Sequence, residues 1–199
     1  MSPTVVLASA SSSRAQILRD AGVSFKVDQA SIDEDAVKQS MRAEETDAEA
    51  VAVTLAELKA MRVSSRHPDA LVIGADQMLD CNGTWFDKPV NTDDVRAHLK
   101  ALAGRSHELI TAACVVSDDS IIWRHVDRAR LTMRQLSDRF INAYLKECGD
   151  SILGSVGAYR VEGLGIQLFS RIDGSHFTIL GLPLIPLLDL LRAHKVVVE

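Results

Sequence analysis

The sequence predicts an α/β fold with a mixed sheet and flanking helices. In the first half of the chain, short apolar runs alternate with amphipathic segments, which is typical of strand–helix units. Two longer runs, 105–116 and 121–133, then follow each other across a short polar turn. Such a turn indicates two strands that pair locally and antiparallel. The combination of both kinds of connection favours a mixed sheet over a purely parallel one.

The composition limits the class of protein. With 199 residues and 47% hydrophobic side chains, the chain is expected to form one domain over 1–199. Its net charge of -5 argues against a nucleic-acid partner. The three cysteines are widely separated, which suits a reducing compartment and argues against a disulfide framework. The sequence shows no signal-peptide pattern and no apolar segment of membrane length, so we expect a cytoplasmic protein without a membrane partner.

The first strand and helix form a candidate anion site. A strand is expected over 4–8 and a helix over 13–20. The serine-rich loop between them contains Ser9, and Arg14 lies in the first turn of the helix. Backbone N–H groups at a helix start attract anions, and a guanidinium matches the geometry of phosphate. The alternative is that these serines only cap the helix.

The next segments contain carboxylates and a lysine. A strand is expected over 23–30, with Phe25 and Val27 directed inward. Glu34 is one of three consecutive carboxylates, which either hold Mg²⁺ or form a solvated loop. The clearest long helix is expected over 47–63, and Lys59 lies at the edge of its apolar stripe.

The stretch 71–91 is central to the functional prediction. Its first six residues predict a buried strand that stops at Asp76, and strand ends of open α/β sheets bind ligands. Asn82-Gly83 predicts a type I′ hairpin turn, which returns the chain so that Lys88 comes back beside Asp76. A carboxylate and an ammonium that converge suit a metal-bound polyphosphate. The alternative is an aspartate that caps a turn and a solvated lysine.

The remaining elements follow in order along the chain. We expect a helix over 92–103, strands over 105–116 and 121–133, a helix over 137–146, a glycine-rich segment over 151–165, a strand over 164–172, a short run over 177–180 and a last helix that ends near 193. Within the glycine-rich segment, Tyr159 either stacks on a base or belongs to a mobile connection.

Taken in order, these segments resemble the Maf family of nucleoside triphosphate pyrophosphatases. The resemblance covers nearly the whole chain and is carried by Leu7-Ala8-Ser9-Ala10-Ser11 with Arg14, Ile32-Asp33-Glu34, Lys59, Gly74-Ala75-Asp76, Lys88-Pro89, 102–105 and Gly181-Leu182-Pro183-Leu184. It implies a Maf/ITPase-like α/β fold with two lobes around a central nucleotide cleft. It also implies hydrolysis of the α–β phosphate bond of a nucleoside triphosphate with Mg²⁺ or Mn²⁺.

The resemblance also implies roles for individual residues. Asp76 matches the catalytic aspartate that activates water, and Glu34 together with Asp76 matches the metal-binding carboxylates. The positions that match substrate-binding residues are Ser9, Arg14, Lys59, Lys88 and Glu162. The family often has Ser-Pro-Arg-Arg where this chain has Ser11-Ser12-Ser13-Arg14. Ser13 therefore replaces one of two arginines, which implies a lower or rearranged phosphate affinity.

The choice of substrate depends on Glu162. Tyr159-Arg160-Val161-Glu162 lies where the dTTP and UTP subgroup usually has Tyr-Gly-Ile-Gln, and the glutamate resembles the subgroup that acts on 7-methyl-GTP. A carboxylate opposes the positive charge of 7-methylguanine and accepts the N–H groups of its edge. The resemblance therefore implies conversion of 7-methyl-GTP to 7-methyl-GMP and pyrophosphate. A dTTP/UTP pyrophosphatase and a non-catalytic regulator of septum formation are the alternatives, and a homodimer is left open.

Overall fold

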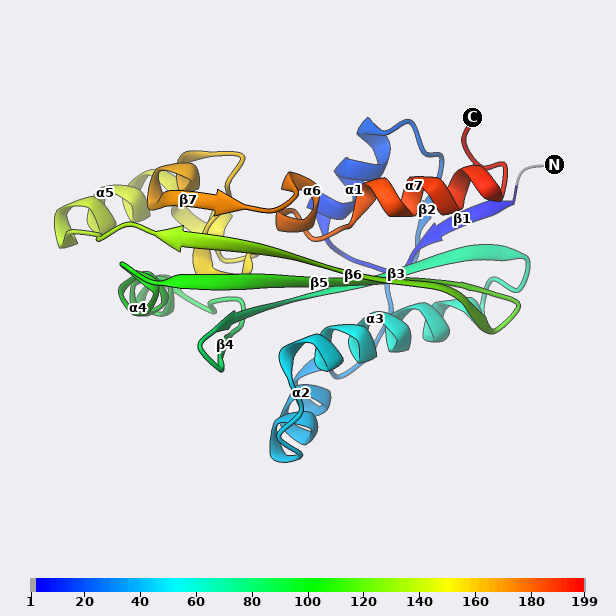
Figure 1. The fold of residues 1–199 in the computed structure, drawn as a ribbon, viewed down its shortest axis with the longest axis horizontal. Helices are drawn as coiled ribbons and strands as arrows, with labels where there is room; N and C mark the ends of the chain where they lie inside the picture. Colours follow the sequence, from blue (N-terminus) through cyan, green and yellow to red (C-terminus); the bar gives the residue numbers. More distant parts are fainter. Residues whose placement is uncertain (1–2, 199) are drawn as a thin grey trace. The chain divides into compact units, whose positions relative to one another are not determined.

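The structure is a computed structural model that describes residues 3–198 (Figure 1). Its strands are β1 (Thr4–Leu7), β2 (Lys26–Val27), β3 (Ala70–Cys81), β4 (Thr84–Phe86), β5 (Ser106–Ser117), β6 (Ser120–Met133) and β7 (Phe169–Asp173). Its α-helices are α1 (Ser12–Asp20), α2 (Glu34–Ala43), α3 (Ala48–Ser64), α4 (Thr92–Leu102), α5 (Asp138–Cys148), α6 (His176–Ile179) and α7 (Leu184–Ala193). Three 3₁₀ turns are η1 (Gly149–Ile152), η2 (Val156–Ala158) and η3 (Leu164–Leu168).

The sheet is mixed, as the sequence predicts. The strands lie in the order β2-β1-β3-β5-β6-β7, and β4 pairs with β3. β1 runs parallel to both β2 and β3, whereas β3 with β4 and β6 with β7 are antiparallel pairs. Helices flank this sheet, so the predicted fold class is confirmed.

The chain divides into two compact units. Unit 1 contains Met1–Gln77, Ile110–Asp127 and Ser175–Glu199, and unit 2 contains Met78–Leu109 and Arg128–Gly174. The central nucleotide cleft and the single domain over 1–199 stay predictions.

Unit 1 has helices on both faces of its strands. Helices α1 and α7 lie on one face and α3 lies on the other (Figure 1). The apolar cluster on the α1 and α7 side receives alternate residues of β3, namely Leu71, Ile73 and Ala75. The intervening residues of β3 point to the α3 side because side chains alternate along a strand.

Gly74 brings α3 close to β3. A Cβ atom at Gly74 would lie 2.2 Å from the carbonyl oxygen of Ala56 and 2.8 Å from the Cβ of Ala60. Both contacts are with α3, so only a residue without a side chain allows this helix to approach the strand so closely. Gly74 and Asp76 lie on the same face of β3, which directs Asp76 towards α3 as well.

In unit 2, α4 contacts both α5 and η2. The hairpin between β3 and β4 has the predicted turn, since Asn82 and Gly83 have φ values of 54° and 82°. Its register pairs Leu79 with Phe86. The turn chemistry that the sequence indicates is therefore confirmed.

Three strand predictions are wrong. The strand over 23–30 is reduced to Lys26–Val27, because β2 meets β1 over only two residues, and Val27 is 52% exposed. Residues Leu164–Leu168 form η3 rather than a strand, and a Cβ at Gly165 would lie 2.4 Å from the carbonyl oxygen of Arg160, so the chain packs tightly on itself there. The third error concerns the end of β3.

Strand β3 does not stop at Asp76 but continues to Cys81. It continues because β4 provides an antiparallel partner beyond the predicted end. Its parallel neighbour β1, however, ends at Leu7 opposite Ile73. Asp76 therefore lies three residues past the end of the adjacent strand, inside β3 rather than at its end.

Within residues 3–198, none of the helices is both long enough and apolar enough to cross a membrane.

Candidate functional site

The centre of the candidate site is a buried ion pair between α3 and β3. Lys59 Nζ donates to Asp76 Oδ1 at 2.5 Å. The two side chains are only 9% and 7% exposed. Buried ions are stable when they are paired, because each offsets the desolvation of the other. Lys59 lies on the same face of α3 as Ala56 and Ala60, the residues that contact Gly74, so the close approach of helix and strand brings the pair together.

Glu34 contacts the same lysine from the start of a surface helix, α2. Its Oε1 lies 2.9 Å from Lys59 Nζ, so one ammonium contacts two carboxylates. Glu34 is the first residue of α2, where the side chain of Asp33 caps the helix by accepting from the N–H of Ala36. None of the residues of α2 is buried, and the Glu34 side chain is 42% exposed. The three residues that the sequence places far apart, Glu34, Lys59 and Asp76, are therefore in contact within unit 1.

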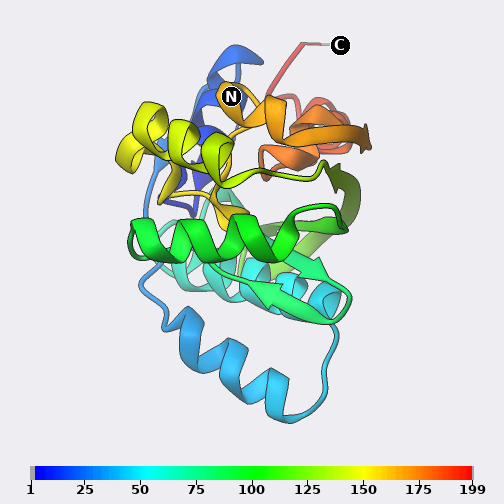
Figure 2. The same cartoon turned by 90° about the vertical axis from the view of Figure 1, so that its left-hand side faces the viewer.

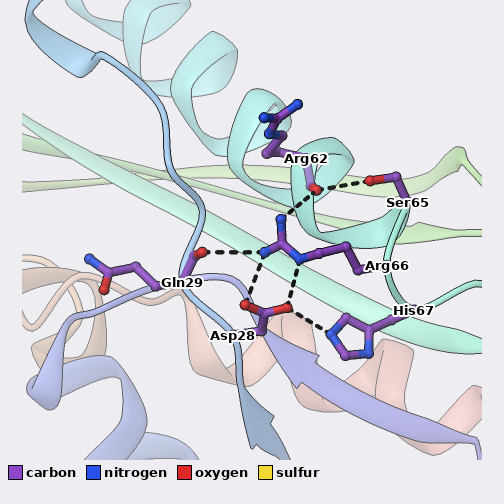
Figure 3. Close-up of polar contacts among 6 residues, drawn as sticks. All are labelled: Asp28, Gln29, Arg62, Ser65, Arg66 and His67. Carbon is purple, nitrogen blue, oxygen red and sulfur yellow. Dashed lines mark hydrogen bonds and ion pairs between the residues drawn. The ribbon is translucent and has the colours of Figure 1, made fainter.

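The segment that carries Glu34 is held at its start by an exposed clasp of Asp28, Arg66 and His67 (Figure 3). Arg66 donates to both carboxylate oxygens of Asp28, at 3.0 and 2.9 Å, and His67 Nε2 lies 2.8 Å from Asp28 Oδ2. Hydrogen bonds from Arg66 and His67 lower the pKa of Asp28. Arg66 also donates to the carbonyl of Gln29, so the clasp joins the chain after β2 to the end of α3.

Arg14 and Ser9 form the second part of the site. Arg14 Nε donates to the carbonyl oxygen of Gly181 at 2.7 Å, and Nη1 donates to Ser9 Oγ at 3.1 Å. These bonds use two of the five N–H groups of a guanidinium. Arg14 is 8% exposed, and burial lowers its pKa while the charges of Asp76 and Glu34 raise it. Arg14 therefore interacts electrostatically with the carboxylates of Asp76 and Glu34.

Two serines of the loop before α1 contact Arg14 in different ways. The predicted capping is confirmed for Ser11, and anion binding by the loop stays a prediction. Ser11 is the N-cap of α1 and accepts from the backbone N–H of Arg14. Ser9 is buried, and its hydroxyl accepts from Arg14 and from the N–H of Ser11. Capping and positioning of Arg14 are thus divided between two residues of one loop.

The acidic residues near Lys59 fit a divalent cation that arrives with a substrate. Among the described residues, no group of three or more His, Cys, Asp or Glu side chains is arranged to hold a metal ion by itself. Glu34 and Asp76 provide two carboxylates that share one ammonium. Mg²⁺ is commonly bound through one or two carboxylates together with substrate phosphates and water. The donor set suits this kind of binding.

Lys88 and Glu162 lie in unit 2. Lys88 is exposed and is the second residue after β4. The Glu162 carboxylate accepts from Arg160, with Oε1 3.0 Å from Nε and 2.9 Å from Nη2. The predicted approach of Lys88 to Asp76 and the predicted contact of Glu162 with a base stay predictions.

Tyr159 is buried within unit 2 and presents no open ring face to a base. It is 4% exposed, its ring packs edge-on against Phe169, and its hydroxyl lies 2.7 Å from Nε2 of His107. Burial lowers the pKa of His107 to about 4 and raises the pKa of Tyr159, so both rings are neutral at pH 7. Tyr159 therefore anchors the turn that leads to Glu162. Sequence reasoning missed this role because a tyrosine between glycines suits both an exposed and a buried ring.

Comparison with known proteins identifies the relatives of the chain. The family model described as Maf-like protein matches residues 4–194. The chain belongs to the Maf family. A relative from Paramagnetospirillum magneticum, named nucleoside triphosphate pyrophosphatase, is 53% identical over 95% of this chain and 97% of its own length. A relative from Rhizobium johnstonii, named 7-methyl-GTP pyrophosphatase, is 47% identical over 96% of each chain.

A solved structure of a nucleoside-triphosphatase, a dITP/XTP pyrophosphatase from Mycobacterium abscessus, covers 96% of each chain with 16% identity and a TM-score of 0.39. Membership of the Maf family rests on the sequence relatives, and the fold class rests on the sheet of this chain.

Proposed function

We propose that this Maf protein is a nucleoside triphosphate pyrophosphatase that adds water across the α–β phosphate bond. The observation that carries the proposal is the buried ion pair of Lys59 with Asp76, which the partly exposed Glu34 joins, together with a buried Arg14 in the same unit. Phosphoryl transfer depends mainly on positioning and on neutralising charge that spreads over phosphate oxygens. The names of the relatives support this activity.

Asp76 is the proposed general base. It removes a proton from the attacking water while the α–β anhydride bond breaks and pyrophosphate leaves, and the proton then passes to solvent. Lys59 and Arg14 are the proposed cations for the triphosphate, and Ser9 holds Arg14 in place. In the free protein the ion pair with Asp76 holds Lys59 in one orientation, and the triphosphate has to compete with Asp76 for this lysine.

Glu34 and Asp76 are the residues that would hold Mg²⁺ or Mn²⁺. When bound, such a cation neutralises charge on the phosphates and lowers the barrier to attack by water. Glu34 suits this role because its exposed side chain can turn from Lys59 to a cation without leaving a buried charge unpaired.

We propose 7-methyl-GTP as the preferred substrate, with Glu162 facing the methylated base and Lys88 contributing to phosphate binding. Two relatives named 7-methyl-GTP pyrophosphatase, from Rhizobium johnstonii and Rhizobium meliloti, support this choice at 47% and 46% identity. Nε and Nη2 of Arg160 both contact Oε1 of Glu162, so Oε2 is the oxygen proposed for the base. The positive charge of 7-methylguanine favours a carboxylate partner over an amide.

A substrate panel tests both levels of the proposal. Wild type is incubated with Mg²⁺ and 7-methyl-GTP, GTP, dTTP or UTP, and pyrophosphate and monophosphate are measured. We expect wild type to turn over 7-methyl-GTP fastest. Glu162→Gln should reduce the ratio of 7-methyl-GTP turnover to GTP turnover by about tenfold. The control Glu147→Gln, at an exposed position, should leave this ratio unchanged. Preferred turnover of dTTP would contradict the choice of base, and release of orthophosphate alone would contradict the pyrophosphatase.

A further inference from the structure

A buried polar network lies next to Arg14 and takes no part in the proposed chemistry. It joins β3, β5 and β6 to the short helix α6, all within unit 1, and α6 lies beside α1 (Figure 1). Its central residue is Thr178, which is fully buried. The hydroxyl of Thr178 donates to Asp127 Oδ2 at 2.5 Å, so one end of α6 is tied to β6 by a charge-assisted bond.

The carbonyl oxygen of Thr178 is held equally firmly. It accepts from Gln77 Nε2 at 2.8 Å, from Thr111 Oγ1 at 2.9 Å and from the backbone N–H of Gly181 at 3.0 Å. Through the last of these bonds, the position of Thr178 determines the position of the Gly181 backbone. A helix of four residues has few internal hydrogen bonds, so these contacts determine where its C-terminal turn lies.

Gly181 is the point where this network meets the phosphate-binding side chain. Its φ of +95° is a backbone conformation that favours glycine, and a Cβ there would lie 3.3 Å from Nε of Arg14. Its carbonyl oxygen then accepts from Arg14 Nε at 2.7 Å. The direction of that carbonyl decides where the guanidinium fork points.

We propose that Thr178 is a positioning residue for anion binding: through Asp127 and the Gly181 carbonyl it fixes the orientation of Arg14. This inference rests on the proposed function, because it takes Arg14 as a phosphate ligand. Thr178 itself touches no substrate. It acts by removing the freedom that an arginine side chain would otherwise lose on binding, which is how preorganisation improves affinity.

The test measures binding of inorganic tripolyphosphate with Mg²⁺ by calorimetry, so that it does not depend on turnover. Thr178→Val keeps the shape but loses the hydroxyl, and we expect its Kd to rise about tenfold. Thr178→Ser, which keeps the hydroxyl, should have the Kd of wild type. Ser64→Ala is the matched control, because Ser64 is also fully buried and donates to an aspartate of unit 1, Asp119, at 3.2 Å. This control should lose stability without losing affinity.

The decisive arm combines Thr178→Val with Arg14→Lys, which keeps a charge but removes the Nε donor. If Thr178 acts through Arg14, the double variant should bind no more weakly than Arg14→Lys alone. Fully additive losses would overturn the inference, as would wild-type protein that fails to bind tripolyphosphate. Hydrolysis of nucleotides by wild type is assayed separately, so binding without hydrolysis would contradict the proposed function and leave this inference standing.

Discussion

The two carboxylates that share Lys59 belong to regions of very different construction. Asp76 lies on a central strand against α3, where Gly74 lets helix and strand pack without a gap. Glu34 lies on α2, which has no buried residue and stands outside α3 in both views (Figures 1 and 2). The core packing around Asp76 fixes its position in advance. Glu34, in contrast, is placed by caps and surface ion pairs, which are individually weak.

This difference predicts separate functions for the two regions: catalysis for Asp76 and binding for Glu34. A general base needs a fixed position relative to the reacting atoms, so a core strand suits Asp76. The proposed role of Glu34 requires its carboxylate to release Lys59 and bind a cation, and an exposed side chain on a surface helix is free to change its conformation in this way. We therefore expect changes in the Asp76 region to reduce the catalytic rate and changes in the α2 region to weaken binding.

The largest effect should follow Asp76→Asn, which keeps the shape of the side chain and removes the proposed general base. We expect kcat to fall between about 100-fold and 10,000-fold, the usual contribution of general base catalysis. Breaking a buried ion pair also destabilises the fold, by about 3–5 kcal/mol, so urea unfolding is measured in parallel. A stable, folded variant with wild-type kcat would exclude Asp76 as the base.

Gly74→Ala tests whether close packing positions the pair. The new Cβ would collide with the Ala56 carbonyl, so α3 has to move and Lys59 moves with it. We expect kcat/KM to fall about 100-fold and the free energy of unfolding to fall by about 1–3 kcal/mol. Ala75→Gly, which changes the neighbouring residue on the other face, is the control for flexibility of β3; equal losses in both variants would show that the approach of α3 is unimportant.

Glu34→Gln should have a smaller effect, confined to binding. We expect KM for the Mg²⁺–nucleotide complex to rise about fivefold to tenfold, with kcat within about threefold of wild type. The free energy of unfolding should change by less than about 1 kcal/mol, since the ion pair is partly exposed. Glu44→Gln, an exposed glutamate just after the same helix, provides the control. A kcat loss as large as that of Asp76→Asn would remove the distinction between the two regions.

The clasp of Asp28, Arg66 and His67 should give the smallest effect on activity. We expect Asp28→Asn to increase hydrogen exchange in 28–46 while kcat/KM changes by less than about fivefold. Exchange in β3 should be unchanged. Increased exchange throughout unit 1 would instead make the clasp part of the core.

The clasp also predicts a pH dependence. Because the folded-state pKa of Asp28 is lowered from 3.8, its stabilising contribution is present above pH 3.8 and is lost as the pH falls through the lowered value. A carbon-13 titration of the Asp28 carboxyl group should therefore show a midpoint below 3.8. Arg66→Gln should move it upwards, because the bond from Arg66 is the largest cause of the shift. If the Asp28 midpoint were the same in Arg66→Gln as in wild type, the clasp would be absent in solution.

The sequence predicted most local structure correctly where a single residue type decides it. Asn82-Gly83 makes the predicted hairpin turn, because both residue types tolerate the positive φ that this turn requires. The end of β3 was wrong because a polar residue after an apolar run looks like an exit from the core. Here the carboxylate stays inside, since a lysine from another element neutralises it.

Contacts between distant elements were harder to predict. The resemblance to a family assigned Lys59 and Asp76 to one site, but the direct ion pair between them was not predicted, because it depends on which face of β3 receives α3. The role of Gly181 as a hydrogen-bond acceptor for Arg14 joins residues 167 positions apart, and no local pattern indicates it. The burial of Tyr159 against His107 and Phe169 similarly depends on tertiary packing.

The most direct test compares Asp76→Asn with Glu34→Gln under one condition. Phosphorus-31 NMR follows the release of pyrophosphate and monophosphate at saturating Mg²⁺ and saturating nucleotide, with 7-methyl-GTP or whichever triphosphate wild type hydrolyses fastest. We predict that Asp76→Asn loses at least about 100-fold in rate while Glu34→Gln stays within about threefold of wild type. Equal losses in the two variants, or a greater loss in Glu34→Gln, would contradict this prediction.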